Sequence, residues 1–324
     1  MNKELRYFLN SYRYLFQHIE LENDFGPDWL AKSYAFIDSL GASILHGASA
    51  RDYAEFRFYE KANIARKRFV TRRRFLNLLR TYNDSEFTHL FRNKINFLKK
   101  FEQFIGRSWL DVGNSTFDDF AQFIEHHERV IVKPLDGGEG RGIWQLNASD
   151  CANDVAAMFE RLKEERVVLE ERVTPGVLSQ FNPGCVNTLR VVSLLRADTT
   201  EIIFATLRMA DGDSITDNHA SGGIAAVVDV GTGLIETSGH NRQDKRFVHH
   251  PVSGAQIIGF QIPGWDRVVS TVVAASKVVP QVRYVGWDVT INCADEVVVI
   301  EGNDRSSRFI QAHNQVGLRN ALNM

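Results

Sequence analysis

Two apolar segments in the last part of the chain predict a β-hairpin that brings two carboxylates together. Residues 284–291 and 297–301 are rich in β-branched residues, and a short polar stretch separates them. A two-residue turn at Ala294-Asp295 places Asp288 directly opposite Glu301. Carboxylates that face each other on neighbouring strands repel unless a cation lies between them. The hairpin therefore indicates a cation site.

Asn303 completes the predicted set of oxygen ligands. It lies two residues after Glu301, so the two side chains share one face if the strand continues. Mg²⁺ prefers carboxylate and amide oxygens and takes its other ligands from water and phosphate. We therefore expect Asp288, Glu301 and Asn303 to hold Mg²⁺. The alternative is a pair of exposed acids on a sheet edge, against which the apolar neighbours at 298–300 argue.

A second expected hairpin carries a lysine and a glycine-rich loop. Residues 130–134 and 142–146 are predicted strands, and four of the six residues from 137 to 142 are glycine. Glycine lets a backbone approach a ligand closely and point its N–H groups at oxyanions. Lys133, just before the loop, predicts a flap over a polyphosphate. A P-loop is excluded, because its lysine follows the glycines. An ordinary glycine-rich hairpin remains the alternative.

Two further strand ends carry charged residues. Residues 167–173 form an expected buried strand that carries two acids, Glu170 and Glu171, near its end. A backbone edge there could meet an adenine, and a carboxylate could meet a ribose hydroxyl. Solvated charges at a strand end are the alternative. Arg190 opens another apolar strand, and an arginine placed there is expected to have a phosphate or carboxylate partner.

The arrangement of these elements predicts an α+β chain in three parts. Residues 1–90 have helical spacing of apolar residues, residues 91–169 mix helices with strands, and residues 170–324 alternate β-branched strands with glycine turns. In the first part we expect helices over 29–46, 51–67 and 71–82. The sheet of the third part is expected to be largely antiparallel.

The segment 66–74 contains six basic residues in nine. It is interpreted as a solvated helix face or as a dock for an anionic glycan, a nucleotide-bearing substrate or an acidic membrane surface. Nucleic acid is the weakest of these partners, because stacking aromatics are not interleaved in a known motif and the formal net charge is −2.

Composition places the chain in a reducing, aqueous compartment. Its three cysteines are far apart and do not form a CxxC pair, which argues against a zinc site. No apolar run approaches the ~18 residues of a membrane-spanning helix, and no secretory signal is visible. We expect a soluble cytoplasmic protein whose oligomeric state the sequence leaves open. The adjacent histidines His126-His127 and His249-His250 cannot chelate from one regular element and are expected on the surface.

The order of these blocks resembles the ATP-grasp superfamily, and most closely its sugar-transfer-associated branch. The resemblance runs from about residue 50 to 318 and includes similarity to glutamate-adding carboxylate–amine ligases. It implies two α/β subdomains with a nucleotide between them, here preceded by an all-helical region. The blocks that carry it are Val132-Lys133-Pro134, Glu170, Asn187–Arg190, Asp217–Gly223 and Glu301-Gly302-Asn303.

The resemblance also implies a role for each matching residue. ATP is expected to contact Lys94 at its α-phosphate, Lys133 at its α- and β-phosphates, the flap glycines Gly138, Gly140 and Gly142, and an adenosine slot of Glu170, Glu171 and Val173. One or two Mg²⁺ ions, for which Mn²⁺ could substitute, are expected on Asp288, Glu301 and Asn303. The γ-phosphate and an acyl-phosphate are expected to face Arg190, Arg208 and Asn218.

The implied activity is an ATP-dependent carboxylate–amine ligase that works through an acyl-phosphate. Its partners are then small-molecule carboxylates and amines, with a uronic acid, sugar nucleotide or glycan as the carboxylated partner in polysaccharide synthesis, and no nucleic acid. One alternative is a kinase on the same fold. Another is a non-catalytic module that binds an anionic glycan or nucleic acid through residues 66–74. Helices replace the βαβ domain common in such ligases, so fold analogy says little about the acceptor.

Overall fold

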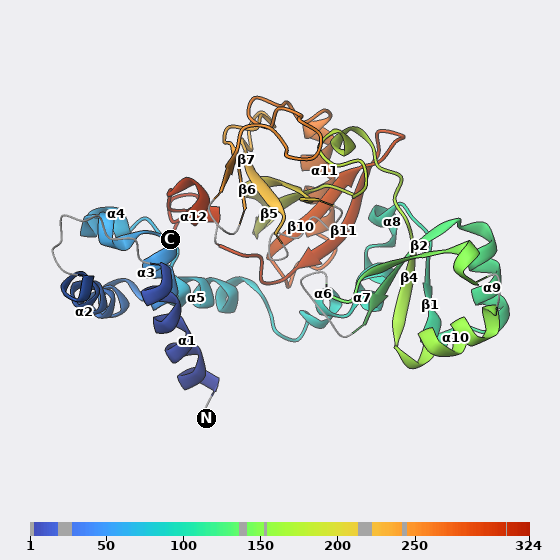
Figure 1. Cartoon of the computed structure of the whole chain (residues 1–324), viewed down its shortest axis with the longest axis horizontal. Helices are drawn as coiled ribbons and strands as arrows, with labels where there is room; N and C mark the ends of the chain where they lie inside the picture. The colour runs from blue at the N-terminus through green and yellow to red at the C-terminus, as the bar shows by residue number, and fades with distance from the viewer. Residues whose placement is uncertain are drawn as a thin grey trace. The chain divides into compact units, whose positions relative to one another are not determined.

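The computed structural model describes residues 3–18, 28–135, 141–151, 154–212, 222–241, 245–308 and 310–324. The chain forms two compact units, Met1–Tyr82 with Ser307–Met324, and Asn83–Ser306 (Figure 1). Its mixture of helices and strands, with a helical region at the N-terminal end, confirms the predicted α+β class. The three-part division at residues 90 and 169 stays a prediction.

The described residues of the first unit are helical. Its elements are α1 (Lys3–His18), α2 (Asp28–His46), α3 (Ala50–Glu55), a 3-10 turn (Phe58–Glu60), α4 (Asn63–Arg66), α5 (Arg72–Tyr82) and α12 (Ile310–Asn314). The predicted helix over 51–67 is wrong. Arg57 has a left-handed backbone with φ of 47°, which ends α3 and separates it from the following turns.

The basic segment 66–74 is not one helix, because α4 ends at Arg66 and α5 begins at Arg72. Arg66 is buried and forms an ion pair with Asp38 at 2.6 Å between Nη2 and Oδ2. Arg74 donates to the carbonyl of Lys67 at 3.0 Å. Part of the segment therefore stabilises the unit itself rather than forming a uniform solvated face.

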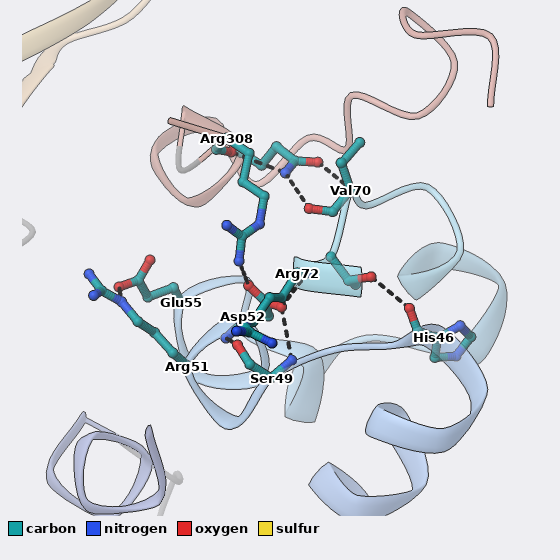
Figure 2. A network of polar contacts seen from close by, with 10 residues as sticks. His46, Ser49, Arg51, Asp52, Glu55, Val70, Arg72 and Arg308 are labelled. Carbon is teal, nitrogen blue, oxygen red and sulfur yellow. Dashed lines mark hydrogen bonds and ion pairs between the residues drawn. The ribbon is translucent and has the colours of Figure 1, made fainter. Parts of the chain in front are cut away.

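A buried carboxylate ties the last residues of the chain to the first unit (Figure 2). Asp52 accepts hydrogen bonds from the backbone N–H groups of Ser49 at 2.9 Å and Arg72 at 2.7 Å, and it pairs with Arg308. Gln311 accepts from the backbone N–H of Val70 at 2.9 Å. Residues 307–324 consequently pack among helices that lie more than two hundred residues earlier in the sequence.

The second unit begins with short helices and a four-stranded antiparallel sheet of order β1-β4-β2-β3. Its elements are α6 (His89–Arg92), α7 (Lys94–Lys100), α8 (Glu102–Ile105), β1 (Trp109–Asp111), a 3-10 turn (Val112–Asn114), α9 (Phe117–His126), β2 (Arg129–Pro134), β3 (Trp144–Asn147), a 3-10 turn (Ala148–Cys151), α10 (Val155–Glu164) and β4 (Val167–Glu171). Apolar side chains of α9 and α10, among them Phe120 and Leu162, pack with Val130 and Leu169 of the sheet to form one core.

The rest of the second unit is a seven-stranded antiparallel sheet of order β11-β10-β5-β6-β7-β8-β9. Its elements are a 3-10 turn (Val177–Gln180), β5 (Thr188–Arg196), β6 (Thr199–Met209), β7 (Ile224–Val228), β8 (Gly239–His240), β9 (Arg246–Phe247), α11 (Trp265–Ser276), β10 (Tyr284–Ile291) and β11 (Val297–Asn303). One face packs against α11 through residues such as Val191, Trp287 and Val272. Because side chains alternate along a strand, Arg190 and Asp288 lie on the opposite face. None of the described helices is long and apolar enough to cross a membrane.

Candidate functional site

The two predicted metal carboxylates, Asp288 and Glu301, lie opposite each other on β10 and β11, as predicted. The route to this pairing differs from the expected one. Ile291 pairs with Val297, so the connecting loop has five residues and moves the register by one. An extra residue in β11, Ile300, forms a β-bulge that moves the register back. The predicted two-residue turn is therefore wrong, and two offsetting irregularities produce the pairing.

Asp288 is neutralised by arginines on two neighbouring strands. Arg190 on β5 lies directly opposite Asp288 and binds both carboxylate oxygens, with 2.8 Å between Nη2 and Oδ2. Arg208 on β6 donates from Nη1 to Oδ2 at 3.0 Å. Burial alone would raise the pKa of Asp288, but the two guanidinium groups outweigh burial and hold that pKa well below its ordinary value. Asp288 is thus ionised at neutral pH, and the expected anionic partner of Arg190 is a carboxylate.

The negative charge of Glu301 is less well neutralised by the protein than that of Asp288. Its side chain is exposed to solvent, and the amide nitrogen of Asn303 donates to its Oε1 at 3.0 Å. The surrounding protein and the Asp288 carboxylate both raise the pKa of Glu301, and the hydrogen bond from Asn303 offsets part of that rise. A cation bound at Glu301 would lower this raised pKa, since it would favour the charged form of the carboxylate.

The donor set fits a hard cation. Two carboxylates and one amide offer oxygen atoms on one strand face, the chemistry that suits Mg²⁺ with several waters retained. Among the described residues there is no group of three or more histidine, cysteine, aspartate or glutamate side chains placed to hold a metal. Protein side chains alone would therefore give a metal ion too few ligands. A metal ion shared with phosphate would take further oxygen ligands from the phosphate. The assignment of Asp288, Glu301 and Asn303 to Mg²⁺ stays a prediction.

Gly286 makes room for the arginine that binds Asp288. A Cβ atom at this position would lie 2.1 Å from Oγ of Ser306 and 3.2 Å from Cδ of Arg190. Arg190 also reaches Oγ of Ser306, at 3.4 Å from Nη1. Glycine is therefore required for the close approach of these two side chains, and no sequence pattern had singled it out.

Glu170 is the centre of a second charged cluster, at the end of β4. It is almost fully buried, and its Oε2 lies 2.8 Å from Nζ of Lys133 and 2.7 Å from Nε of Arg107. Burial would raise the pKa of Glu170, but Arg107 and Lys133 outweigh it and lower that pKa to about 2. The predicted phosphate lysine and the predicted adenosine-slot acid are therefore direct neighbours.

Arg107 is a residue that the sequence reasoning missed. Its side chain is 2% exposed and joins the two sheets of the unit. Besides Glu170, its guanidinium donates to the carbonyls of Val299 at 2.9 Å and Ile300 at 3.1 Å. No motif marks Arg107, and nothing in the sequence analysis pointed to the residues around β1, which follows it. It connects the cluster around Glu170 with the bulge beside Glu301.

Lys94 lies close to the end of β2. It is the first residue of α7, and its Nζ donates to the carbonyl of Pro134 at 2.7 Å. This places Lys94 next to Lys133 in the fold, as two lysines that share one polyphosphate would need. Gly142 has a φ of 72°, and a Cβ atom there would lie 3.0 Å from Cγ of Pro134. Gly138 and Gly140 lie outside the described residues.

Glu171 and Val173 differ in whether they already have hydrogen-bond partners within the protein. Oε2 of Glu171 accepts from the backbone N–H of Ser108 at 3.0 Å and lies 3.6 Å from Nε2 of His127. Within the described part of the chain, the backbone N–H and C=O of Val173 have no hydrogen-bond partner. The Val173 backbone is thus available to a ligand, while Glu171 already has protein partners. Both assignments to an adenosine slot stay predictions.

The predicted γ-phosphate residue Asn218 lies outside the described residues, but the start of its loop is anchored. Asn182 donates to the carbonyls of Ala210 at 3.1 Å and Gly212 at 2.9 Å. His250 is buried, with Nε2 3.0 Å from the same Ala210 carbonyl. The expectation that His250 lies on the surface is therefore wrong, because its ring is buried against Ala210.

Comparison with known proteins adds a family and several similar folds. Residues 73–324 match the family described as sugar-transfer associated ATP-grasp. No curated protein matches the chain in sequence. Similar solved structures include the ATP-grasp ligase PsnB complexed with minimal precursor, Mg and ADP, at 18% identity and a TM-score of 0.42, covering 72% of this chain and 58% of that one.

Two further structures belong to ligases named for amino acid substrates. An L-amino acid ligase from Bacillus licheniformis is 11% identical with a TM-score of 0.43, covering 70% of this chain and 43% of that one. A D-alanyl-alanine synthetase A from Vibrio cholerae is 14% identical with a TM-score of 0.43, covering 70% of this chain and 60% of that one. This chain spans less than two thirds of the length of each of the three proteins.

Proposed function

The chain belongs to the sugar-transfer-associated ATP-grasp family, and on that premise we propose that it is an ATP- and Mg²⁺-dependent carboxylate–amine ligase. Membership confirms the resemblance stated from the sequence and the ATP-grasp fold that it implied. The proposed reaction passes through an acyl-phosphate and yields an amide, ADP and phosphate. We place it in the cytoplasm, where ATP and Mg²⁺ are both available.

One observation carries the proposal. Glu301 and Asn303 offer oxygen ligands directly beside Asp288, whose own charge Arg190 and Arg208 already balance. Phosphoryl transfer depends on positive charge placed around the transferred group. When bound, Mg²⁺ would neutralise phosphate oxygens and help to orient them. The arginines are fixed by Asp288 before any substrate arrives, so they can stabilise charge without reorganising.

The second cluster supports a nucleotide beside this site. Lys94 and Lys133 would contact the phosphates, with Gly138, Gly140 and Gly142 as a flap that excludes water. Glu170, Glu171 and Val173 would line the adenosine slot. Lys133 forms an ion pair with Glu170 in the structure. When Lys133 turns toward a phosphate, Arg107 would still neutralise the negative charge of Glu170.

The chemistry needs no side-chain nucleophile. A carboxylate oxygen of the substrate attacks the γ-phosphorus of ATP, the bond to the bridging oxygen breaks, and ADP leaves with that electron pair. The amine nitrogen then attacks the acyl carbon, phosphate leaves, and a proton of the amine goes to solvent. Arg190, Arg208 and Asn218 would face the transferred phosphoryl group in both steps.

We propose a carboxylated sugar, such as a uronic acid in a sugar nucleotide or glycan, as the carboxylate, and an amino acid or other amine as the second substrate. The family description, which associates these proteins with sugar transfer, supports the first half of this assignment. The ligase chemistry supports the second half. Surface-polysaccharide synthesis is the process that such a product would serve.

The test is ATP turnover against pooled sugar acids and amino acids, with products read by mass spectrometry. A ligase forms ADP at its full rate only when carboxylate and amine are both present, and the product mass equals their sum less one water. A kinase would form ADP and a phosphorylated product without any amine. That result would overturn the proposal of a ligase but would leave the proposal of an ATP-binding site intact.

Lys133→Ala is the matched loss-of-function variant. Arg107 still pairs with Glu170 in this variant, so the fold is expected to persist while turnover falls by about a hundredfold or more. Lys163→Ala, at an exposed lysine of α10, is the control and should keep full activity. Unchanged turnover in Lys133→Ala would mean that the chain does not use this lysine for phosphate.

A further inference from the structure

Helix α2 of the first unit exposes a long apolar face (α2 in Figure 1). Besides Phe36, which packs against Tyr12 and Phe16 of α1, six large apolar side chains on it are between 36% and 75% exposed: Leu30, Tyr34, Ile37, Leu40, Ile44 and Leu45. Five of them recur at intervals of three or four residues, which places them on one side of a helix. The opposite side, with Ala35, Ser39 and Ala42, is buried in the unit. The exposed face is therefore a continuous apolar stripe.

Charge is missing where a solvated helix face would carry it. Of the residues between 30 and 45 whose side chains are described, the exposed ones are all apolar or serine. The two charged residues, Lys32 and Asp38, lie on half-buried flanks, and Asp38 pairs with Arg66 and Tyr53. A solvated face normally carries polar and charged residues, so this one has the character of an interface.

The stripe is complementary to itself when two copies run antiparallel. In a pair centred on Ile37, Leu30 of one copy faces Ile44 of the other, and Tyr34 faces Leu40, the residue beside Gly41. A Cβ atom at Gly41 would meet nothing within 4 Å in its own chain. Glycine at this position is therefore not required by packing within the unit. A bulky Tyr34 from a second copy would occupy the space that it leaves.

We propose that the chain forms a two-fold symmetric dimer through antiparallel pairing of α2. The six side chains expose on the order of 600 Å² per copy, if a large apolar residue offers roughly 150–250 Å². A standard interface buries about 800 Å² per partner, so the stripe supplies most of one. A two-fold pair uses the same patch on both copies, which is the commonest form of soluble oligomer.

A lipid surface is the less suitable partner. Helices that lie in a membrane interface carry lysine and arginine along their polar face. Of the described side chains of α2, Lys32 is the one lysine, and it is half-buried. A second copy needs no such charges, because it supplies a matching apolar stripe.

Site-specific cross-linking tests the pairing and its direction. Cys293 is exposed while Cys151 and Cys185 are buried, so Cys293→Ser provides the background. Ile37→Cys should cross-link to itself under mild oxidation. Leu30→Cys and Ile44→Cys should each form no cross-link when tested alone, and they should cross-link to each other when the two variants are mixed. Val252→Cys, exposed in the second unit, is the control and should not cross-link. Cross-linking of Leu30→Cys to itself would overturn the antiparallel arrangement.

Sedimentation measures the dimer without any cross-link. Wild type should sediment as a dimer at tens of micromolar, and Ile37→Asp as a monomer with unchanged circular dichroism. Gly41→Leu is the sharper variant, because a Cβ atom there has no neighbour within 4 Å in its own chain and leucine favours the helix. It should nevertheless weaken the dimer about tenfold or more by blocking Tyr34. A monomeric wild type overturns the proposal, and so does equal dimerisation of all three proteins. Monomers that bind anionic vesicles through Ile37 would assign the stripe to a membrane instead.

Discussion

The buried guanidinium of Arg107 donates a hydrogen bond to the carbonyl of Ile300, the residue that bulges out of register in β11. A bulge leaves backbone groups without a strand partner, and such groups need another donor or acceptor. Arg107 supplies the donor, and its other side pairs with Glu170 of the smaller sheet. The register that sets Glu301 opposite Asp288 is therefore supported from the cluster around Glu170.

Replacement of Arg107 should destabilise the second unit. Arg107→Met leaves Glu170 with Lys133 alone and leaves the Val299 and Ile300 carbonyls without their donor. We expect a loss of roughly 3–5 kcal/mol in the free energy of unfolding, as for other buried ion pairs that lose one partner. Arg107→Lys should lose less, because the charge stays while the forked geometry is lost. Chemical denaturation measures both. Arg161→Met, at an exposed pair with Glu165, is the control and should cost under about 1 kcal/mol.

The two carboxylates of the hairpin should respond in opposite ways to neutral replacement. Glu301→Gln removes a repulsion with Asp288, so the free energy of unfolding should stay constant or rise slightly while Mg²⁺-dependent turnover is lost. Asp288→Asn leaves Arg190 and Arg208 without their anion and should destabilise by about 2–4 kcal/mol. Thermal unfolding and turnover on the same preparations separate these effects. Equal destabilisation by both variants would contradict the charge balance described here.

Mg²⁺ affinity should fall as pH falls. The pKa of Glu301 is raised above its ordinary value, so protonation removes this ligand at a higher pH than for an isolated glutamate. Without Mg²⁺ the same group should lower stability as pH rises through that pKa, because its charged form is disfavoured in the folded state. Titration calorimetry of Mg²⁺ at several pH values, with proton release measured in two buffers, checks the trend in affinity. Chemical unfolding without Mg²⁺ at the same pH values checks the trend in stability. A pH-independent affinity would show that Glu301 does not bind the cation.

Gly286 should tolerate a side chain only if Ser306 gives way. Gly286→Ala puts a methyl group into the space of Ser306 and against Arg190, so turnover should drop by about tenfold or more while ATP binding changes little. Ser306→Gly alone should have a small effect. The double variant should recover part of the lost turnover, since the clash is relieved. No recovery in the double variant would place the cause elsewhere than at Ser306.

Acid should unfold the second unit partly through Glu170. Its pKa is about 2 in the folded chain against an ordinary 4.5, so its stabilising contribution is complete above the ordinary value and is lost as pH falls toward 2. Glu170→Gln should therefore flatten the pH dependence of stability between these limits. Urea unfolding at a series of acidic pH values, for wild type and variant, measures the difference.

Long elements with strong periodicity could be predicted from the sequence. The strand at 284–291 has the predicted bounds, and α2 and α5 begin and end within a residue of expectation. The pairing of Asp288 with Glu301 was also correct, although through a wrong turn. A bulge such as that at Ile300 has no clear signature in the residues themselves, because it depends on what lies beside the strand edge.

Contacts between distant segments could not be predicted. Arg107 and Gly286 are unremarkable in sequence, and their importance follows from tertiary neighbours at Ile300 and Ser306. The same is true of Arg66, which was grouped with a basic surface but pairs with Asp38 inside the helical unit. The sequence shows where the basic residues are, but their burial in the folded chain determines which of them stabilise the fold.

The contacts of Arg308 with Asp52 and of Gln311 with Val70 mean that the helical unit is made from both ends of the chain. A chimaera that swaps only the leading helices between two relatives would bring in a foreign surface for α12 to dock on. An exchange of this helical unit must therefore carry a discontinuous pair of segments, and the trailing one is inherited together with strand β11, which precedes it.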